Sequence, residues 1–146
     1  MKIDKRKYIY LAGAIEAAKD DGRNWRRSIQ NFLEEKGYKV LNPVTEETKA
    51  LQAHDAPKDW HNFKQTNINE YRRIMRKIID FDMDIVNNKA GAIVVRWNDY
   101  AQKGAGTHSE LTSAYLHKVP VIMIHDIPLD EIPGWLLGTV DVFFPS

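Results

Sequence analysis

The alternation of short apolar runs with helical periodicity constrains the fold of this chain more than any other feature. Strands that alternate with amphipathic helices form parallel sheets joined by right-handed crossovers. We therefore predict a single doubly wound α/β domain spanning residues 1–146, built on a parallel five-stranded sheet. The expected strands are 8–13, 38–41, 92–95, 119–124 and 140–144, and the expected helices are 24–36, 67 to about 88, and 111–118.

Residues 44–66 break this alternation. The segment is polar, shows no clear period and contains Pro57, Trp60 and two histidines. A connection of this length inside a compact domain usually covers a site or is disordered. We expect an irregular loop here.

Composition excludes several classes of function. The chain has 146 residues, 43% hydrophobic and 28% charged, which is typical of a soluble globular protein. Its net charge of +1 gives no electrostatic reason to bind nucleic acid polymers. The first apolar run is too short for a signal peptide or a membrane span. We expect a cytoplasmic protein with neither membrane nor nucleic acid as a partner.

The residues do not form a recognisable metal or cofactor motif. Cysteine is absent, which excludes thiolate zinc sites and cysteine nucleophiles. Asp80, Asp82 and Asp84 suggest a calcium loop, but Ile85 and Gly91 stand where that loop needs glycine and glutamate. Neither a dinucleotide fingerprint nor a phosphate-binding loop occurs. We predict no metal and no cofactor. The five histidines, which lack metal-ligand spacing, are His54, His61, His108, His117 and His125.

The predicted fold directs the search for a site. Open parallel sheets bind ligands beyond the carboxyl ends of their strands. The segments expected there are 13–16, from Gly13 to Glu16, then 42–43, 96–99 together with 104–110, and 125–126.

The segment GAGTHSE at 104–110 is the most informative of these. Glycines let backbone N–H groups approach a ligand, and a helix N-terminus favours anions. A carboxylate held there is expected to stay ionised, as a nucleophile must be. However, Thr107 and Glu110 also fit a capping box, in which each side chain bonds the other residue's backbone N–H. The residues alone leave both roles for Glu110 open.

The three aspartates of the long predicted helix form a second acidic group. Asp80 and Asp84 share one helical face, and Asp82 points elsewhere. We expect two of the three to be surface charges and one to point into the site. Helical spacing does not decide which.

Three segments in order resemble the nucleoside 2-deoxyribosyltransferase family and the related nucleotide N-glycosidases. They are IYLAG at 9–13, Asp82-Met83 ahead of AIVV at 92–95, and GAGT at 104–107 leading to Glu110, Leu111 and Ala114. The run KVPVI at 118–122 is similar to the family's strand after the catalytic helix.

The resemblance implies a flavodoxin-like fold and cleavage of the N-glycosidic bond of a 2′-deoxynucleoside or its 5′-phosphate. Glu110 matches the family nucleophile that attacks C1′, with transfer to another base or to water. Asp82 matches the aspartate that orients the sugar or assists base departure, and Asp84 is the fallback. Tyr10 matches a tyrosine near the nucleophile, and Gly13 a turn that lets the substrate approach.

The resemblance also implies partners and further binding residues. The partners are a nucleoside or nucleotide and a free nucleobase, in a homo-oligomer whose subunits share active sites. Lys103 stands where many members carry a carboxylate, and Asp99 lies further off. Arg23 or Lys103 could hold a phosphate. The stretch at 132–135 replaces the residue that a neighbouring subunit usually contributes, so Trp135 could contact the base. The expected substrate-binding set is Gly13, Asp84, Asp99, Gly104, Gly106, Thr107 and Trp135.

Three functions follow as hypotheses. The first is a nucleoside 2-deoxyribosyltransferase working through a glycosyl-Glu110 intermediate. The second is a nucleoside 5′-monophosphate N-glycosidase with water as the acceptor. The third is a nucleotide-binding module that has kept the fold without catalysis.

Overall fold

The computed structural model describes residues 1–15, 19–20 and 22–146. Short apolar runs form the strands and the longer segments form helices, as the alternation predicts. In chain order the elements are β1 (Tyr8–Ala12), α1 (Arg23–Glu35), β2 (Lys39–Leu41), α2 (Pro43–Ala53), the 3₁₀ turn η1 (Trp60–Asn62), α3 (Phe63–Thr66), α4 (Ile68–Asp84), the π-helical turn η2 (Ile85–Lys89), β3 (Ala90–Trp97), α5 (Asp99–Lys103), α6 (Ala105–Leu116), β4 (Val121–His125), the 3₁₀ turn η3 (Leu129–Glu131), α7 (Gly134–Leu137) and β5 (Val142–Pro145).

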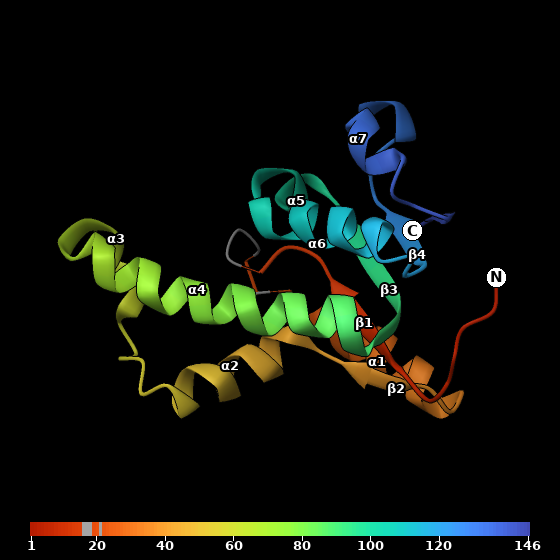
Figure 1. The fold of residues 1–146 in the computed structure, drawn as a ribbon. Helices are drawn as coiled ribbons and strands as arrows, with labels where there is room; N and C mark the ends of the chain where they lie inside the picture. Colours follow the sequence, from red (N-terminus) through yellow and green to blue (C-terminus); the bar gives the residue numbers. More distant parts are fainter. Residues whose placement is uncertain (16–18, 21) are drawn as a thin grey trace.

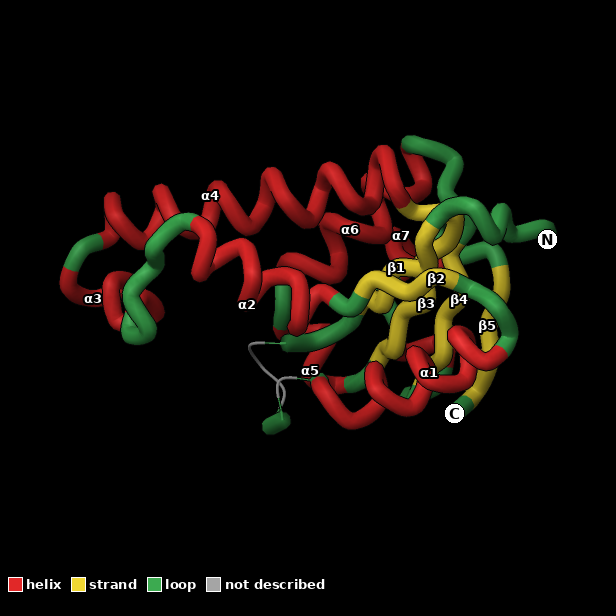
Figure 2. The backbone as a smooth tube through the Cα atoms, turned by 90° about the horizontal axis from the view of Figure 1, so that it is seen from below, coloured by secondary structure: helices red, strands yellow, loops and turns green. Residues whose placement is uncertain are grey.

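The five strands form one parallel sheet in the order β2-β1-β3-β4-β5 (Figures 1 and 2). This is the flavodoxin-like order, in which the chain reverses direction across the sheet between β1 and β3. The predicted α/β fold with a five-stranded parallel sheet is therefore confirmed. The reversal places the ends of β1 and β3 beside each other, at the edge where such sheets bind ligands.

Alternate side chains of each strand bury against different helices. On β1, Tyr10 and Ala12 belong to the larger core, which also contains Leu111 of α6 and Val86 of η2. Ile9 and Leu11 face the opposite way, toward the apolar stripe of α1. Figure 2 shows the sheet between α1 on one side and α4 with α6 on the other. Burial on both faces explains why the strands read as continuous apolar runs.

A smaller core joins α2 to the first half of α4, beyond the edge of the sheet. It consists of Trp60, Tyr71, Ile74 and Ile78, with Leu51 of α2 packed against them. In Figure 1, α3 and the start of α4 project to the left of the sheet, and α2 runs beneath α4. This small core sets the position of α2 relative to the sheet.

The prediction of an irregular loop over 44–66 is wrong. Most of the segment forms α2, η1 and α3. Asn42 is the N-cap of α2, its side chain accepting a hydrogen bond from the Val44 N–H at 3.1 Å, and Pro43 is the first helical residue. Both are favoured at a helix start, although Asn-Pro also fits the end of a strand.

The helix predicted over 111–118 begins six residues earlier. Gly104 is the N-cap of α6 and contributes no side-chain cap. Thr107 and Glu110 both lie inside the helix, so the capping box that their spacing allowed does not form. Glu110 occupies the second turn rather than the first, which frees its side chain for another role.

Two smaller differences concern the other helices. The helix predicted from 67 to about 88 ends at Asp84, and η2 follows it. On α1, Trp25, Ile29 and Leu33 pack against the sheet, whereas Phe32 is exposed. Among the described residues, no helix is long and apolar enough to cross a membrane.

Two glycines provide a matched test of this geometry. Gly13 has φ +151, and a Cβ there would lie 2.9 Å from the Trp25 ring, whereas a Cβ on Gly106 would meet nothing within 4 Å. We expect Gly13→Ala to lower the free energy of unfolding by about 1–3 kcal/mol because it adds backbone strain and a clash. Gly106→Ala, in a helix, should be neutral or slightly stabilising. Denaturant melts of both variants check this, and equal effects would contradict it.

Candidate active site

Tyr10 and Glu110 meet inside the larger core. Tyr10 points from the middle of β1 and is 1% exposed, and Glu110 points from the second turn of α6 and is 8% exposed. The Tyr10 hydroxyl faces the Glu110 carboxylate and interacts with it by hydrogen bonding. Within the described residues, the Glu110 carboxylate oxygen Oε2 is buried without a hydrogen-bond partner. A buried oxygen of this kind is available to a ligand.

Asp82 brings a second carboxyl group to the same place. It lies in the last turn of α4, and its Oδ1 is also buried without a partner among the described residues. The charge of Glu110 acts on Asp82, and the charges of both act on Tyr10. The sheet and its covering helices thus bring together Tyr10, Asp82 and Glu110, the three residues that we expected to be catalytic.

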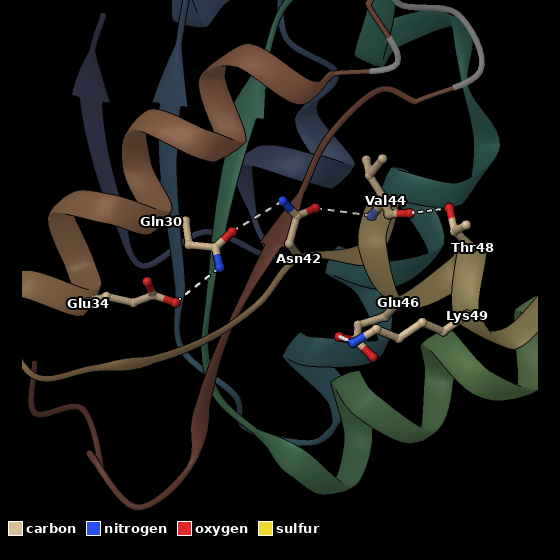
Figure 3. Close-up of polar contacts among 7 residues, drawn as sticks. All are labelled: Gln30, Glu34, Asn42, Val44, Glu46, Thr48 and Lys49. Atoms are coloured by element: carbon tan, nitrogen blue, oxygen red, sulfur yellow. Dashed lines mark hydrogen bonds and ion pairs between the residues drawn. The ribbon is translucent and has the colours of Figure 1, made fainter.

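A third carboxyl group, Glu47 of α2, was not predicted. Its carboxyl group is hydrogen-bonded to that of Asp82. The cap at the start of α2 determines the position of Glu47. Figure 3 shows how this cap is held: Asn42 accepts from the Val44 N–H and donates through Nδ2 to Gln30 of α1 at 3.3 Å. The neighbouring Glu46 instead forms a surface ion pair with Lys49. We call Glu47, Asp82 and Glu110 the carboxyl cluster.

Burial controls the ionisation of Glu110. Loss of water raises the pKa of Glu110 from 4.5 to about 7, and the nearby Glu47 adds to this rise. Tyr10, through its hydrogen bond, and Arg26, through its charge, oppose the rise. The expectation that Glu110 stays fully ionised at neutral pH is therefore too simple, because a helix N-terminus is not what dominates its surroundings. Near pH 7 the protein contains both forms.

Glu47 and Asp82 hold a proton between them. Burial raises the pKa of both groups, and the charges of Glu47 and Glu110 raise that of Asp82 further. The hydrogen bond between the two groups lowers the pKa of Glu47 and raises that of Asp82, so Asp82 holds the shared proton. Burial also raises the pKa of Tyr10 well above 10, which keeps its hydroxyl protonated.

These groups can therefore divide the roles of a two-step displacement. A carboxylate that ionises near neutral pH can act as a nucleophile. A protonated carboxyl group beside it can donate a proton to a leaving group and later take one back. Environments that push the pKa values of neighbouring carboxyl groups apart are typical of acid–base sites.

Several predicted site residues lie outside the carboxyl cluster. Asp84, the fallback for Asp82, is exposed and bonded to Asn88 at 2.8 Å and Lys89 at 3.5 Å. Asp80 is exposed on α4 with Arg76 and Lys77 around it. Of the three aspartates, the structure turns only Asp82 inward.

Asp99 and Trp135 are also separate from the cluster. Asp99 is exposed at the first residue of α5. Trp135 is 74% exposed on α7, and its indole N–H donates to the Thr112 hydroxyl of α6 at 3.1 Å. Arg23 and Lys103 are exposed as well. A contact of any of them with substrate stays a prediction.

The predicted glycine positions divide into two kinds. Gly104 and Gly106 stand at the start of α6, where the space beside Gly106 is open, and Thr107 is buried in the same turn. Gly13 has a positive φ and lies against the Trp25 ring, and its predicted contact with substrate stays a prediction. Glu16, at the end of the predicted rim segment, lies outside the described residues. No metal-binding group of three or more His, Asp or Glu side chains occurs in the described ranges.

Comparison with solved structures supports the fold. The chain resembles the structure of a 2-deoxyribosyltransferase from the psychrotolerant bacterium Bacillus psychrosaccharolyticus, with a TM-score of 0.61 and 14% sequence identity. The superposition covers 95% of this chain and 86% of that one. No protein-family model and no curated protein sequence matches the chain. At this identity the likeness establishes a shared fold.

Burial of the cluster predicts a stability that depends on pH. Below pH 4.5 Glu110 is protonated in both the folded and the unfolded chain. As pH rises from 4.5 to about 7, the unfolded chain releases this proton first, so folding loses on the order of 3 kcal/mol. We expect Glu110→Gln to remove this loss, so that its stability relative to the unmodified protein increases from pH 4.5 to pH 8.

Chemical denaturation at pH 4.5, 6 and 8 measures the effect. Glu35→Gln, on the exposed surface of α1, is the matched control and should follow the unmodified protein at every pH. A Glu110→Gln curve that runs parallel to that of the unmodified protein would refute the burial argument.

Proposed function

We propose that this protein cleaves the N-glycosidic bond of 2′-deoxynucleosides and transfers the sugar to an acceptor base, with Glu110 as the nucleophile. The observation that carries the proposal is the buried pairing of Glu110 with Tyr10 beside a protonated carboxyl pair. The resemblance of three ordered segments and the shared fold with a 2-deoxyribosyltransferase support the same chemistry.

In the first step the ionised Glu110 attacks C1′ of the sugar. A bond forms between its oxygen and C1′ as the bond from C1′ to the base nitrogen breaks, and the electron pair leaves with the base. The Glu47–Asp82 pair gives its proton to the departing base. The Tyr10 hydroxyl holds the carboxylate in place and gives up its hydrogen bond as the charge is consumed.

In the second step an acceptor base attacks C1′ on the opposite side. The carboxyl pair takes the acceptor's proton, and the bond between C1′ and Glu110 breaks to regenerate the carboxylate. Two inversions at C1′ retain its configuration. Water in place of the base gives hydrolysis by the same steps.

The first test is base exchange. We expect a 2′-deoxynucleoside and a different free base to yield the exchanged nucleoside, and Glu110→Gln to lose at least about 10³-fold in kcat because the nucleophile is gone. Parallel reactions with the 5′-monophosphate and without an acceptor base identify a nucleotide hydrolase. Binding without turnover of either substrate, or full activity of Glu110→Gln, would overturn the proposal.

The second test concerns Glu47. The profile of kcat/KM against pH should be bell-shaped, with an acid limb near pH 7 from Glu110 and a basic limb from the carboxyl pair. Glu47 raises the pKa of both Glu110 and Asp82. Glu47→Gln removes this charge, so both limbs of the variant's pH profile should shift to lower pH. Its kcat should fall by about 10²-fold or more.

Glu46→Gln is the matched control, since Glu46 lies next in the chain and pairs with Lys49 on the surface. It should leave both limbs unchanged. A Glu47→Gln profile identical to that of Glu46→Gln would exclude Glu47 from the reaction.

A further inference from the structure

Among the described residues, Arg26 is the one charged residue with no exposed surface, at 0% exposure. Within the described residues, its guanidinium donates to four backbone carbonyl oxygens: Nε to Leu11 at 3.1 Å, Nη2 to Gly13 at 2.9 Å, and Nη1 to Ala14 at 3.2 Å and Gly22 at 3.1 Å. Only arginine, with five donors in a rigid plane, can satisfy four carbonyls in this way.

These four carbonyls lie at the two ends of the connection between β1 and α1. Leu11, Gly13 and Ala14 follow Tyr10 closely along the chain, and Gly22 caps the start of α1. A Cβ on Gly22 would lie 2.2 Å from Arg26 Nη1 and 2.4 Å from the Ala14 oxygen, so this close approach requires glycine. Arg26 therefore fixes both ends of the connection that leaves the strand carrying Tyr10.

The same helix also holds the start of α2. Gln30, one turn after Arg26, accepts from Asn42, the N-cap of the helix that carries Glu47 (Figure 3). Two side chains of α1 thus help to position the elements around the carboxyl cluster: Arg26 bonds the backbone after β1, and Gln30 bonds the Asn42 side chain at the start of α2.

Arg26 also provides the positive charge that faces this cluster. The groups that act on it are Tyr10, Glu110, Glu47 and Asp20. Asp20 is engaged with the backbone N–H groups of Gly22 and Asn24, each at 3.0 Å. A buried guanidinium stays charged, and in a site with little water its field reaches the carboxyl groups with little screening.

We propose that Arg26 is a positioning residue of the active site, which fixes the backbone after Tyr10 and supplies a positive charge that favours the ionised form of Glu110. The catalytic part of this role depends on the function proposed above. The electrostatic part does not, because it concerns Glu110 in the free protein.

The effect of a substitution at Arg26 on the pKa of Glu110 depends on the groups that face Glu110 from each neighbouring element. They are Tyr10 from β1, Arg26 from α1, Glu47 from α2 and Asp82 from α4. Burial and Glu47 raise the pKa of Glu110, whereas Tyr10 and Arg26 lower it. Loss of the Arg26 charge leaves Tyr10 alone to oppose the rise.

The test compares Arg26→Met and Arg26→Lys with Arg27→Met, a control at the adjacent exposed position of α1. The readout is the pH titration of the Glu110 side-chain carbon by ¹³C NMR, identified by the loss of its signal in Glu110→Gln. We expect Arg26→Met to raise this pKa by about one unit, at the small end of what a nearby opposite charge produces. Arg27→Met should leave it unchanged.

Arg26→Lys separates the two roles, and it covers the case in which Arg26→Met fails to fold. It keeps the charge but cannot reach four carbonyls. We expect the Glu110 titration to stay close to that of the unmodified protein while KM rises. A Glu110 titration unchanged in folded Arg26→Met, or raised by a full unit in Arg26→Lys, would overturn the proposal.

Activity adds a second readout. The acid limb of kcat/KM should move with the NMR titration, so Arg26→Met loses about tenfold at pH 6 and recovers at higher pH. If the unmodified protein does not cleave nucleosides at all, the proposed function fails, but the NMR titration still decides the role of Arg26.

Discussion

Burial of three carboxyl groups in one core is the constraint on which the rest of this structure depends. Glu47, Asp82 and Glu110 come from three different helices, and each loses most of its contact with water. Such a cluster costs folding energy that the apolar packing around Leu111 and Val86 must offset. It also gives the groups different protonation states: Glu47 and Asp82 share a proton, and Glu110 ionises near neutral pH. The arrangement is poor for stability and well suited to acid–base chemistry.

Periodicity was sufficient to predict the sheet, because its central strands β1 and β3 are apolar on both faces and α1 and α4 each have a clear apolar stripe. It failed for α2. Only a few apolar residues of that helix, such as Leu51, reach the small core, and the Asn42-Pro43 pair was interpreted as the end of β2. The start of α6 was missed for a related reason. Two glycines suggested a turn, although glycine is tolerated in the first turn of a helix, where backbone N–H groups have no helical partner.

The candidate site was predictable in part. Tyr10, Asp82 and Glu110 were selected from the sequence, and the structure brings them together. The choice of Asp82 over its two neighbours could not come from helical spacing, since it depends on how α4 packs against the sheet. Glu47 was missed along with its helix. Arg26 was missed because its partners are backbone carbonyls. Every residue has such a group, so no sequence pattern identifies these partners.

The proposed mechanism requires Glu110 to form a covalent bond to the sugar. Mass spectrometry of the protein, quenched with acid during turnover of a 2′-deoxynucleoside and then digested, tests it most directly. We expect a mass increase equal to one deoxyribosyl group on the peptide that contains Glu110, and no increase in Glu110→Gln. Turnover without any adduct, or an adduct on a different residue, would contradict it.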